Sequence, residues 1–554
     1  MLKYTALFLL LLIVGVILYF NFGISIDAPA QVNLDALKLE RQQKGNNFYV
    51  LKNNWLRKNQ QGIWEMYLEG EAFERGVVHG KLAKELVIKQ EDDFVGEIKK
   101  IIPSEFYLKF LKYFILWFNR DIDDYITEEY QKEIYGVSFS ASPNYNFIGN
   151  NYERILNYHA AHDIGHALQD KKLVPGCTAF GTWDSRTADS SLVLGRNFDF
   201  FVGEKFAEEK IVCFIKPDSG YKLMYVTWGG FTGVVSGMNE KGLTITLNAS
   251  KSDVPTRAAT PISVLAREIL QYASNIKEAY AIAEKRQTFV SEAIMVGSAE
   301  DDKTYIIEKS PTKIGLLETT GNEISCSNHF QGANFKSQEN IQERSSVYRY
   351  QRLQQLLKRY PEMDENKAAL ILRDQRGLDD KNIGMGNEKA LNQLIAHHSV
   401  IFKPKQGLMW VSANPFQLGE YVCYDLNKVF ANCAGLKEDK AVNEQTLDIP
   451  ADSFLLSSDY QNFLTYKQYR KTLIENRGKD WRVKEPYIKE FENTNPEFYY
   501  TYWLIGDYYR FNEKDFATAV KYYEIALTKE VPRDNEIAYL EKSIRVCKEK
   551  QSKP

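Results

Sequence analysis

The strongest constraint on the fold is a change of pattern at residue 177. Between residues 84 and 172, apolar residues recur at three- and four-residue spacing, as in FLKYFILWF, which predicts helices. From Cys177 onward the β-rich runs CTAFGTW, SLVLGRN, KIVCFIK, KLMYVTW and GLTITLN follow one another, separated by turn signals such as DSG at 218–220. Two helical stretches come next, and strands return at EAIMVGSA and KTYIIEKS. This order predicts an α+β fold in which antiparallel sheets are layered with helices.

Composition excludes several classes of protein. The chain has 554 residues, of which 44% are hydrophobic and 26% charged, so it has enough apolar residues for a large core. Its formal net charge is −3, which argues against nucleic acid as a partner. The six cysteines form no CxxC pair, so a zinc ribbon is not expected. A disulfide between Cys423 and Cys433 stays open at this stage.

The N-terminus predicts a membrane anchor. Residues 4–22, YTALFLLLLIVGVILYFNF, carry no charge, and about 20 apolar residues span a bilayer as a helix. No small-residue cleavage site and no cysteine for lipid attachment follow directly, which favours an anchor over a cleaved signal peptide. Lys3 is the one flanking charge, and it favours a body outside the cytoplasm, either periplasmic or on the cell surface. A cleaved signal would give the same compartment.

The C-terminal stretch, residues 496–554, resembles a tetratricopeptide unit. Matching positions in the first helix are Tyr502, Gly506 and Tyr509, and those in the second are Ala519, Tyr523 and Ala526. The loop between the helices is one residue longer than the consensus. Such units usually need three or more neighbours to bury their faces. One unit and a final helix therefore indicate packing on the rest of the protein, rather than a peptide-binding array.

A cysteine at the head of a strand is a candidate nucleophile, and it needs a base. The thiolate is the reactive form of the side chain. No CGSCW-type signature of the papain-like enzymes is present. If the Gly176–Cys177 bond is cut, Cys177 gains a free α-amine with a pKa near about 8, which can act as the base for its own thiol. Pro175 and Gly176 give the preceding peptide a backbone suited to such a cut.

Six ordered motifs resemble those of the N-terminal-nucleophile (Ntn) hydrolases of the penicillin acyltransferase type, peptidase family C45, and more distantly the choloylglycine hydrolases. The motifs are LEGEAFERGVVHGKL at 68–82, GCTAFG at 176–181, LGRNFDF at 194–200, MNEKGLTITLN at 238–248, CSNHF at 326–330 and SSVYRYQRL at 345–353. The resemblance covers about residues 60 to 430. It implies a four-layer αββα sandwich and self-cleavage between Gly176 and Cys177.

The resemblance also implies a role for each matching residue. Cys177 would be the nucleophile both of self-cleavage and of acyl transfer. Arg196 would lie beside the thiolate and depress its pKa. Asp199 would hold the α-amine, and Asn248 would contribute to the oxyanion hole.

Two more matching residues complete the implied site. Asn328 resembles the second asparagine of the pocket, and Arg349 resembles the distal arginine that supports it. Each of these residues could alternatively have a structural role: Asp199 could cap a turn, and Asn248 could be a turn residue. The polar loop at 184–191 between two predicted strands departs from the family pattern, and its length affects whether the Arg196 side chain reaches the Cys177 sulfur.

These assignments divide the chain into six parts: residues 1–23 as anchor or signal, 24–60 as linker, 61–176 as a helical pro-segment, 177–440 as the Ntn-hydrolase domain, 441–495 as a connecting segment and 496–554 as the tetratricopeptide-like extension. The whole segment of 176 residues before Cys177 is longer than the family pattern and includes the apolar stretch, and the helical extension is additional. We expect the pro-segment to stay bound after cleavage.

A cluster of histidines offers a competing site. His159, His162 and His166 in HAAHDIGH share one face of a helix, and imidazole suits zinc. The motif is not HExxH, so pocket lining is favoured over metal binding, with His166 and His329 as candidate substrate contacts. His397 and His398 are predicted to lie in a loop. No metal or other cofactor is expected.

The sequence therefore predicts an anchored, self-cleaving amidohydrolase. Cys177 would attack a linear amide of an N-acylated small molecule and form an acyl-enzyme that water resolves. One alternative is an acyltransferase that uses acyl-coenzyme A and faces the cytoplasm. The other is a membrane-anchored scaffold without enzymatic activity, which uses the C-terminal helices as its working surface and would not need Cys177.

Overall fold

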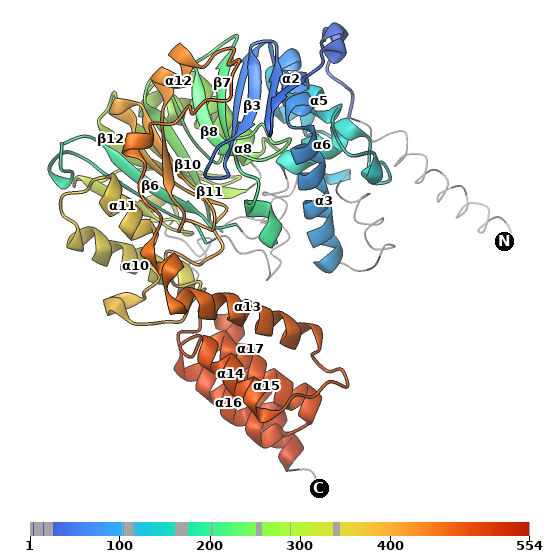
Figure 1. Cartoon of the computed structure of the whole chain (residues 1–554), viewed down its shortest axis with the longest axis vertical. Helices are drawn as coiled ribbons and strands as arrows, with labels where there is room; N and C mark the ends of the chain where they lie inside the picture. Colours follow the sequence, from blue (N-terminus) through green and yellow to red (C-terminus); the bar gives the residue numbers. More distant parts are fainter. Residues whose placement is uncertain are drawn as a thin grey trace.

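The computed structural model describes residues 26–101, 117–160, 176–200, 203–250, 258–288, 290–335 and 344–552, together with Tyr4, Leu11, Gly15, Ser104, Tyr113 and Ile115. Two stacked β-sheets with helices on both outer faces form the body, and a group of helices lies below it (Figure 1). The predicted α+β content is confirmed, and the body has the four layers helix, sheet, sheet, helix.

Within the described residues the larger sheet has eleven strands, in the order β1-β2-β3-β4-β7-β8-β9-β10-β11-β12-β13. Their bounds are Gln42–Gly45, Phe48–Leu51, Asn54–Lys58, Trp64–Gly70, Ile211–Pro217, Leu223–Thr227, Ser236–Asn239, Leu243–Ser250, Ser291–Ser298, Lys303–Lys309 and Ile314–Leu317. Neighbouring strands are antiparallel except β4 and β7, which pair in parallel along seven residues. The prediction of antiparallel sheets is therefore wrong where β4 meets β7.

The smaller sheet has six strands among the described residues, in the order β14-β5-β6-β15-β16-β17. Their bounds are Glu323–Cys326, Thr178–Thr182, Val193–Phe198, His398–Lys403, Leu408–Ser412 and Tyr421–Asp425. All neighbours are antiparallel. The strand that follows Cys177 is thus central, with β6 on one side and β14 on the other.

Three apolar layers hold the sandwich together. Trp55, Phe214, Val400 and Met409 belong to the core between the two sheets. Outside the larger sheet lie α2 (Ala72–Leu82), α3 (Lys84–Ile101), α5 (Glu128–Ser138), α6 (Asn151–His159), α8 (Ile262–Tyr272) and α9 (Ile276–Lys285). Outside the smaller sheet lie α10 (Arg344–Arg359) and α11 (Glu365–Leu372). A further helix, α12 (Leu426–Asn432), follows β17.

The segment before Cys177 is built into the larger sheet. Residues 24–60, expected as a linker, contain the first three strands, and β4 continues the sheet into the β7 edge. The expected helical pro-segment supplies α2, α3, α5 and α6. The sequence did not predict β1, because its QQKG run has no alternation of apolar and polar residues.

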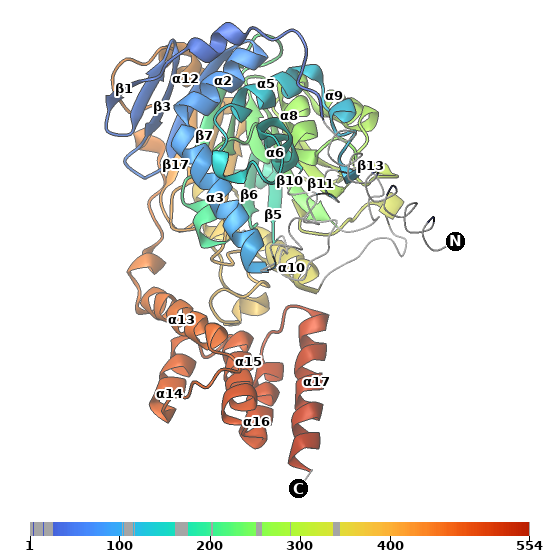
Figure 2. The ribbon, with the colours of Figure 1, turned by 90° about the vertical axis from the view of Figure 1, so that its right-hand side faces the viewer.

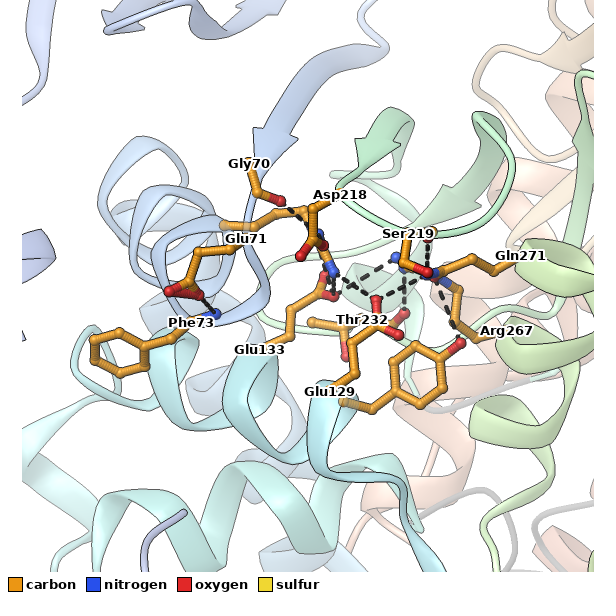
Figure 3. Close-up of polar contacts among 12 residues, drawn as sticks. Gly70, Glu71, Phe73, Glu129, Glu133, Asp218, Ser219, Thr232, Arg267 and Gln271 are labelled. Atoms are coloured by element: carbon orange, nitrogen blue, oxygen red, sulfur yellow. Dashed lines mark hydrogen bonds and ion pairs between the residues drawn. The ribbon is translucent and has the colours of Figure 1, made fainter. Parts of the chain in front are cut away.

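A buried ionic cluster also joins this segment to the rest of the body (Figure 3). Glu133 on α5 pairs with Arg75 on α2 at 2.7 Å and with Arg267 on α8 at 3.6 Å. All three side chains are almost fully buried. Burial opposes ionisation of Glu133, but the two guanidinium groups outweigh it and lower its pKa. Removing one partner would leave a buried charge uncompensated.

The C-terminal helices form a second core below the sandwich (Figure 2). They are α13 (Ser458–Glu475), α14 (Glu485–Thr494), α15 (Tyr499–Tyr508), α16 (Phe516–Thr528) and α17 (Asp534–Gln551). The expected connecting segment, 441–495, therefore contributes two of these helices. Tyr523 packs on Gly506, and a π-helical turn at Tyr509–Glu513 leads toward the second helix of the pair. The assignment of these helices as a tetratricopeptide unit stays a prediction.

None of the helices within the described residues is long and apolar enough to cross a bilayer. The apolar stretch at 4–22 lies outside the described residues except for Tyr4, Leu11 and Gly15.

Candidate active site

Cys177 lies directly before β5, where the smaller sheet meets β10 of the larger one. The peptide nitrogen of Gly176 donates to the carbonyl oxygen of Asp199 at 2.8 Å, so strand-like pairing extends past the end of β6. The sulfur of Cys177 lies 4.0 Å from the same oxygen. The residue is 1% exposed. The Gly176–Cys177 bond is thus held in a fixed position by the residue that follows β6.

Arg196 on β6 brings its guanidinium group to this sulfur. Its Nη2 lies 3.6 Å from the Cys177 Sγ and also donates to the carbonyl oxygen of Leu247. Its Nη1 donates to Ser236 Oγ at 2.6 Å. The ring of Phe198 lies 4.4 Å from the guanidinium carbon. The predicted proximity of Arg196 to the sulfur is confirmed, and the loop at 184–191 does not prevent it.

Arg196 acts to lower the pKa of the Cys177 thiol, as predicted, but it does not decide the direction of the net shift in the uncut chain. Burial raises the pKa of Cys177, and the charge of Arg196 offsets this in part. Burial likewise lowers the pKa of Arg196. The thiol is therefore protonated near neutral pH while the chain is uncut, and its attack on a carbonyl requires a proton acceptor.

Asp199 is a suitable acceptor. Its side chain is fully buried, and neither carboxyl oxygen has a hydrogen-bond partner within the described residues. Burial raises its pKa to about 7, although Arg349 and Arg196 act in the opposite direction. A carboxyl group with this pKa exchanges a proton readily near neutral pH. The alternative role as a turn cap is not supported by its side-chain contacts.

Asn248 supplies an unused amide beside these groups. It sits near the end of β10, between Leu247, which bonds Arg196, and Ala249, which bonds Asn328. Its side chain is fully buried, and neither its amide nitrogen nor its oxygen has a partner within the described residues. A buried amide without a partner is costly unless something else satisfies it. A negatively charged oxygen formed during a reaction would do so.

Asn328 and Arg349 tie helix α10 to the same strand. Asn328 follows β14 and donates from Nδ2 to the carbonyl oxygen of Ala249 at 2.9 Å. Arg349 donates from Nη2 to Asn328 Oδ1 and from Nη1 to the carbonyl oxygen of Glu388 at 2.8 Å. Both residues are buried. These contacts position the end of β10 and therefore Asn248.

The histidines have mainly structural contacts. His329 Nδ1 lies 2.8 Å from Ser346 Oγ, and burial, with Arg349, lowers the pKa of His329 to about 4. His159 lies between the carbonyl oxygen of Ile155, at 2.8 Å, and Thr232, whose backbone nitrogen donates to Nε2 at 2.9 Å. The candidate His166 and the neighbouring His162 lie outside the described residues. No cluster of metal-ligating side chains occurs within the described part of the chain.

Three residues near the site were not predicted. Gln393 donates from Nε2 to the carbonyl oxygen of Gly176 at 2.8 Å, so it contacts the bond expected to break. His397 and His398 were expected in a loop, but both are buried, and His398 begins β15. His398 Nε2 lies 2.9 Å from Ser236 Oγ, which also accepts from Arg196. No sequence motif surrounds these residues, and the fold alone brings them to residues about 200 positions earlier.

Residues 185–415 match the family model of acyl-coenzyme A:6-aminopenicillanic acid acyl-transferase. The central part of the chain is therefore similar to that family, over less than half of its length. The match includes Arg196, Asp199, Asn248, Asn328, Arg349 and Gln393, and it begins shortly after Cys177.

Individual relatives are distant. An uncharacterised protein of Archaeoglobus fulgidus is 23% identical over 353 residues, which are 56% of this chain and 58% of the relative. The N-acylethanolamine-hydrolyzing acid amidase of Caenorhabditis elegans is 26% identical over 226 residues, which are 39% of this chain and 59% of the relative. The chain thus spans less than two thirds of the length of these curated relatives.

Among solved structures, the Caenorhabditis elegans ortholog of the same amidase superposes with a TM-score of 0.31 and 16% identity, covering 41% of this chain and 93% of the other.

Proposed function

We propose that the protein is a cysteine amidohydrolase that cuts its own Gly176–Cys177 bond and then hydrolyses linear amide bonds of N-acylated small molecules. One observation carries the proposal. A buried thiol lies 3.6 Å from a guanidinium nitrogen, and the carbonyl oxygen of the preceding residue accepts a hydrogen bond from Gln393. A nucleophile, a cation and a polarised carbonyl group are therefore assembled around one peptide bond.

In the first reaction, the Cys177 sulfur attacks the carbonyl carbon of Gly176. The thiol proton passes to Asp199, the C–N bond breaks, and Asp199 returns the proton to the departing nitrogen. Water then hydrolyses the resulting thioester, which gives a carboxyl group on Gly176 and restores the thiol. Gln393 stabilises the negative charge that develops on the Gly176 oxygen.

In the second reaction, the new α-amine of Cys177 accepts the thiol proton, since its pKa near about 8 allows this at neutral pH. The sulfur attacks the substrate carbonyl and forms an acyl-enzyme, and the amine gives the proton to the leaving nitrogen. Asn248 donates to the oxyanion from its unused amide. Arg196 stabilises the thiolate, and water releases the carboxylic acid.

The proposed substrate class is supported by the family model and by the relatives that the chain resembles. The name of the Caenorhabditis elegans relative describes an amidase that hydrolyses an N-acylethanolamine. The family model is named for an acyl-transferase, and the same acyl-enzyme would serve either reaction. A transferase passes the acyl group to an amine or thiol instead of water. We favour hydrolysis because coenzyme A is scarce outside the cytoplasm, where we place the body of the protein.

Two accompanying proposals concern the segment before Cys177. We propose that it stays bound after cleavage, because β4 pairs with β7 along seven residues and Glu133 pairs with Arg267. We also propose that residues 4–22 anchor the protein with its body outside the cytoplasm, because this stretch has no charge. Extraction of membranes with alkaline carbonate tests the anchor: release of the uncut protein into the supernatant would contradict it.

Trapping the acyl-enzyme tests the amidase directly. Purified protein is mixed with N-acyl para-nitroanilides, quenched in acid and weighed by mass spectrometry. We expect the fragment that begins at Cys177 to gain the mass of the acyl group, and para-nitroaniline to be released. Cys177→Ala should abolish both signals. Cys213→Ala, a matched change of another buried free thiol, should keep them. Equal turnover by Cys177→Ala and wild type would overturn the proposal, and acyl transfer to added amines without release of acid would favour the transferase.

A further inference from the structure

The C-terminal helices hold one loop of the body in place. In the loop at residues 382–395, Met385 forms two hydrogen bonds with Asn495. Its backbone nitrogen donates to Asn495 Oδ1 at 3.0 Å, and its carbonyl oxygen accepts from Asn495 Nδ2 at 2.9 Å. Asn387 Nδ2 donates to the carbonyl oxygen of Glu530 at 3.0 Å, and Lys389 pairs with the Glu530 carboxylate at 2.7 Å. Helices α14 to α17 therefore determine where this loop lies.

The same loop reaches the candidate active site at two points. Glu388 pairs with Arg533 ahead of α17, and its carbonyl oxygen accepts from Arg349 at 2.8 Å. Five residues later, Gln393 donates to the carbonyl oxygen of Gly176. Leu394, the next residue, is part of the core of the C-terminal helices. The loop at residues 382–395 thus connects the C-terminal helices to the Gly176–Cys177 bond.

A cavity lies where the loop, the body and the helices meet. Its volume is about 60 Å³, and its lining is mainly apolar, with several aromatic rings. The lining includes Phe206 and Phe416 from the body, Gln393 from the loop, and Phe463, Tyr466 and Phe498 from the C-terminal helices. Lys467 and Arg470 of α13 also contribute to the wall, where their aliphatic stems can cover apolar surface.

The position of Gln393 shows which part of a substrate would face this cavity. In the uncut chain, Gly176 is the acyl component of the bond that Cys177 attacks, and Gln393 holds its carbonyl oxygen. In an acyl-enzyme, the substrate acyl group takes the place of Gly176 on the sulfur. Its carbonyl oxygen then lies within reach of Gln393, and its chain continues toward the cavity that Gln393 lines.

We propose that the C-terminal helices complete the acyl-binding pocket of the enzyme, and that Phe463 of α13 limits the length of an apolar acyl chain. The inference rests on the proposed amidase function. It gives the helical extension a role in substrate selection, in addition to packing. Phe463 is suited to this role because the residue is 5% exposed and its ring lies 3.4 Å from the position that a Cβ on Gly386 would occupy.

The test uses the full-length, self-cleaved protein and a series of para-nitroanilides with straight acyl chains from acetyl to palmitoyl. We expect Phe463→Ala to move the preferred chain to greater length, with a gain in kcat/KM of about fourfold for each added methylene that the enlarged pocket buries. Phe463→Leu should give a smaller shift in the same direction. Leu473→Ala, an equally buried change on the same helix that does not line the cavity, should keep the wild-type preference.

Two measurements separate this inference from the amidase proposal. If the Phe463→Ala and Phe463→Leu variants are active but keep the wild-type chain-length preference, the acyl-pocket proposal is wrong and the amidase proposal still stands. If the cleaved wild-type protein hydrolyses none of the probes, the amidase proposal fails. The acyl-pocket proposal is then tested by the binding of free straight-chain carboxylic acids, measured by calorimetry. Tighter binding of longer acids by Phe463→Ala than by wild type supports the pocket, and identical affinities contradict it.

Discussion

At the scale of single residues, the proposed chemistry depends on the protonation state of buried groups. Burial raises the pKa of the Cys177 thiol and brings that of Asp199 to about 7. Arg196 and Asn248 supply the positive charge and the amide that the reaction would use. The uncut chain therefore holds the Cys177 thiol protonated, and Asp199 is the carboxyl group that we propose accepts its proton.

We expect Asp199→Asn to change the pH dependence of stability. Since the pKa of Asp199 is about 7 in the fold and about 3.9 in the unfolded chain, the stability due to its bound proton is fully present below about pH 4 and lost as the pH rises through about 7. Asparagine removes this loss. The measurement is urea unfolding in a Cys177→Ala background, which prevents cleavage. The free energy of unfolding of the Asp199→Asn variant should exceed that of the Asp199 protein by an amount that grows by roughly a few kcal/mol between mildly acidic and mildly alkaline buffer. An advantage independent of pH would contradict the assignment.

Gln393→Ala should slow self-cleavage. The substitution removes the donor to the Gly176 oxygen, and loss of one oxyanion donor costs roughly a hundredfold or more in rate. The measurement is the fraction of cut chain against time after synthesis, followed on denaturing gels. Gln417→Ala removes another buried amide, which donates instead to the carbonyl oxygen of Leu372, and it should keep the wild-type rate. Equal rates for the two variants would exclude Gln393 from the reaction.

Most of the candidate site could be predicted from the sequence, because each predicted residue stands in a motif, and all except Arg349 on α10 lie in or next to a strand. Cys177, Asp199 and Asn328 follow or precede paired strands, so pairing alone brings them together. Gln393 could not be predicted, because its position depends on a loop held by helices about a hundred residues further along. The direction of the Cys177 pKa shift also could not, because it depends on burial.

At the scale of elements, the segment before Cys177 and the body share one sheet and one ionic cluster. The parallel joint between β4 and β7 lies in the middle of the larger sheet, and Glu133 bridges α2, α5 and α8. Sequence patterns predicted the strands after residue 177, where apolar residues alternate. They missed β1 to β3, because β1 is a polar run, and β2 and β3, with four and five residues, are too short to show such an alternation.

Glu133→Ala should strongly destabilise the uncut protein. The substitution leaves Arg75 and Arg267 buried without their shared carboxylate, and breaking a buried pair in this way costs roughly 3–5 kcal/mol. The measurement is the free energy of unfolding in urea, in the Cys177→Ala background. Glu128→Ala on the same helix removes a carboxylate that is 67% exposed and should change stability by less than about 1 kcal/mol. Similar losses in both variants would show that the cluster contributes little.

At the scale of the whole molecule, the C-terminal helices contact the loop at residues 382–395, and this loop also contacts the candidate site. Sequence analysis gave these helices a packing role, which their contacts with residues 382–395 support. It could not identify the loop as their partner, since the contacting residues are more than a hundred positions apart and carry no shared pattern. The proposed acyl pocket follows from this arrangement.

Gly384→Ala tests the connection between the helices and the site. A Cβ on Gly384 would lie 2.4 Å from the Cα of Phe498, so the loop and the start of α15 would have to separate. We expect slower self-cleavage, because Gln393 would move with the loop. Gly478→Ala is the matched control: its φ of +73° resembles the +84° of Gly384, but nothing lies within 4 Å of its Cβ position. Equal cleavage rates in the two variants would contradict the coupling.

The central claim is that Cys177 becomes an N-terminus. Intact-mass analysis with N-terminal sequencing of the purified wild-type protein, beside the Cys177→Ala variant, tests it most directly. The account predicts two wild-type chains, the second beginning at Cys177, and one uncut chain for the variant. A single unbroken wild-type chain, or a cut at the same bond in both proteins, would contradict it.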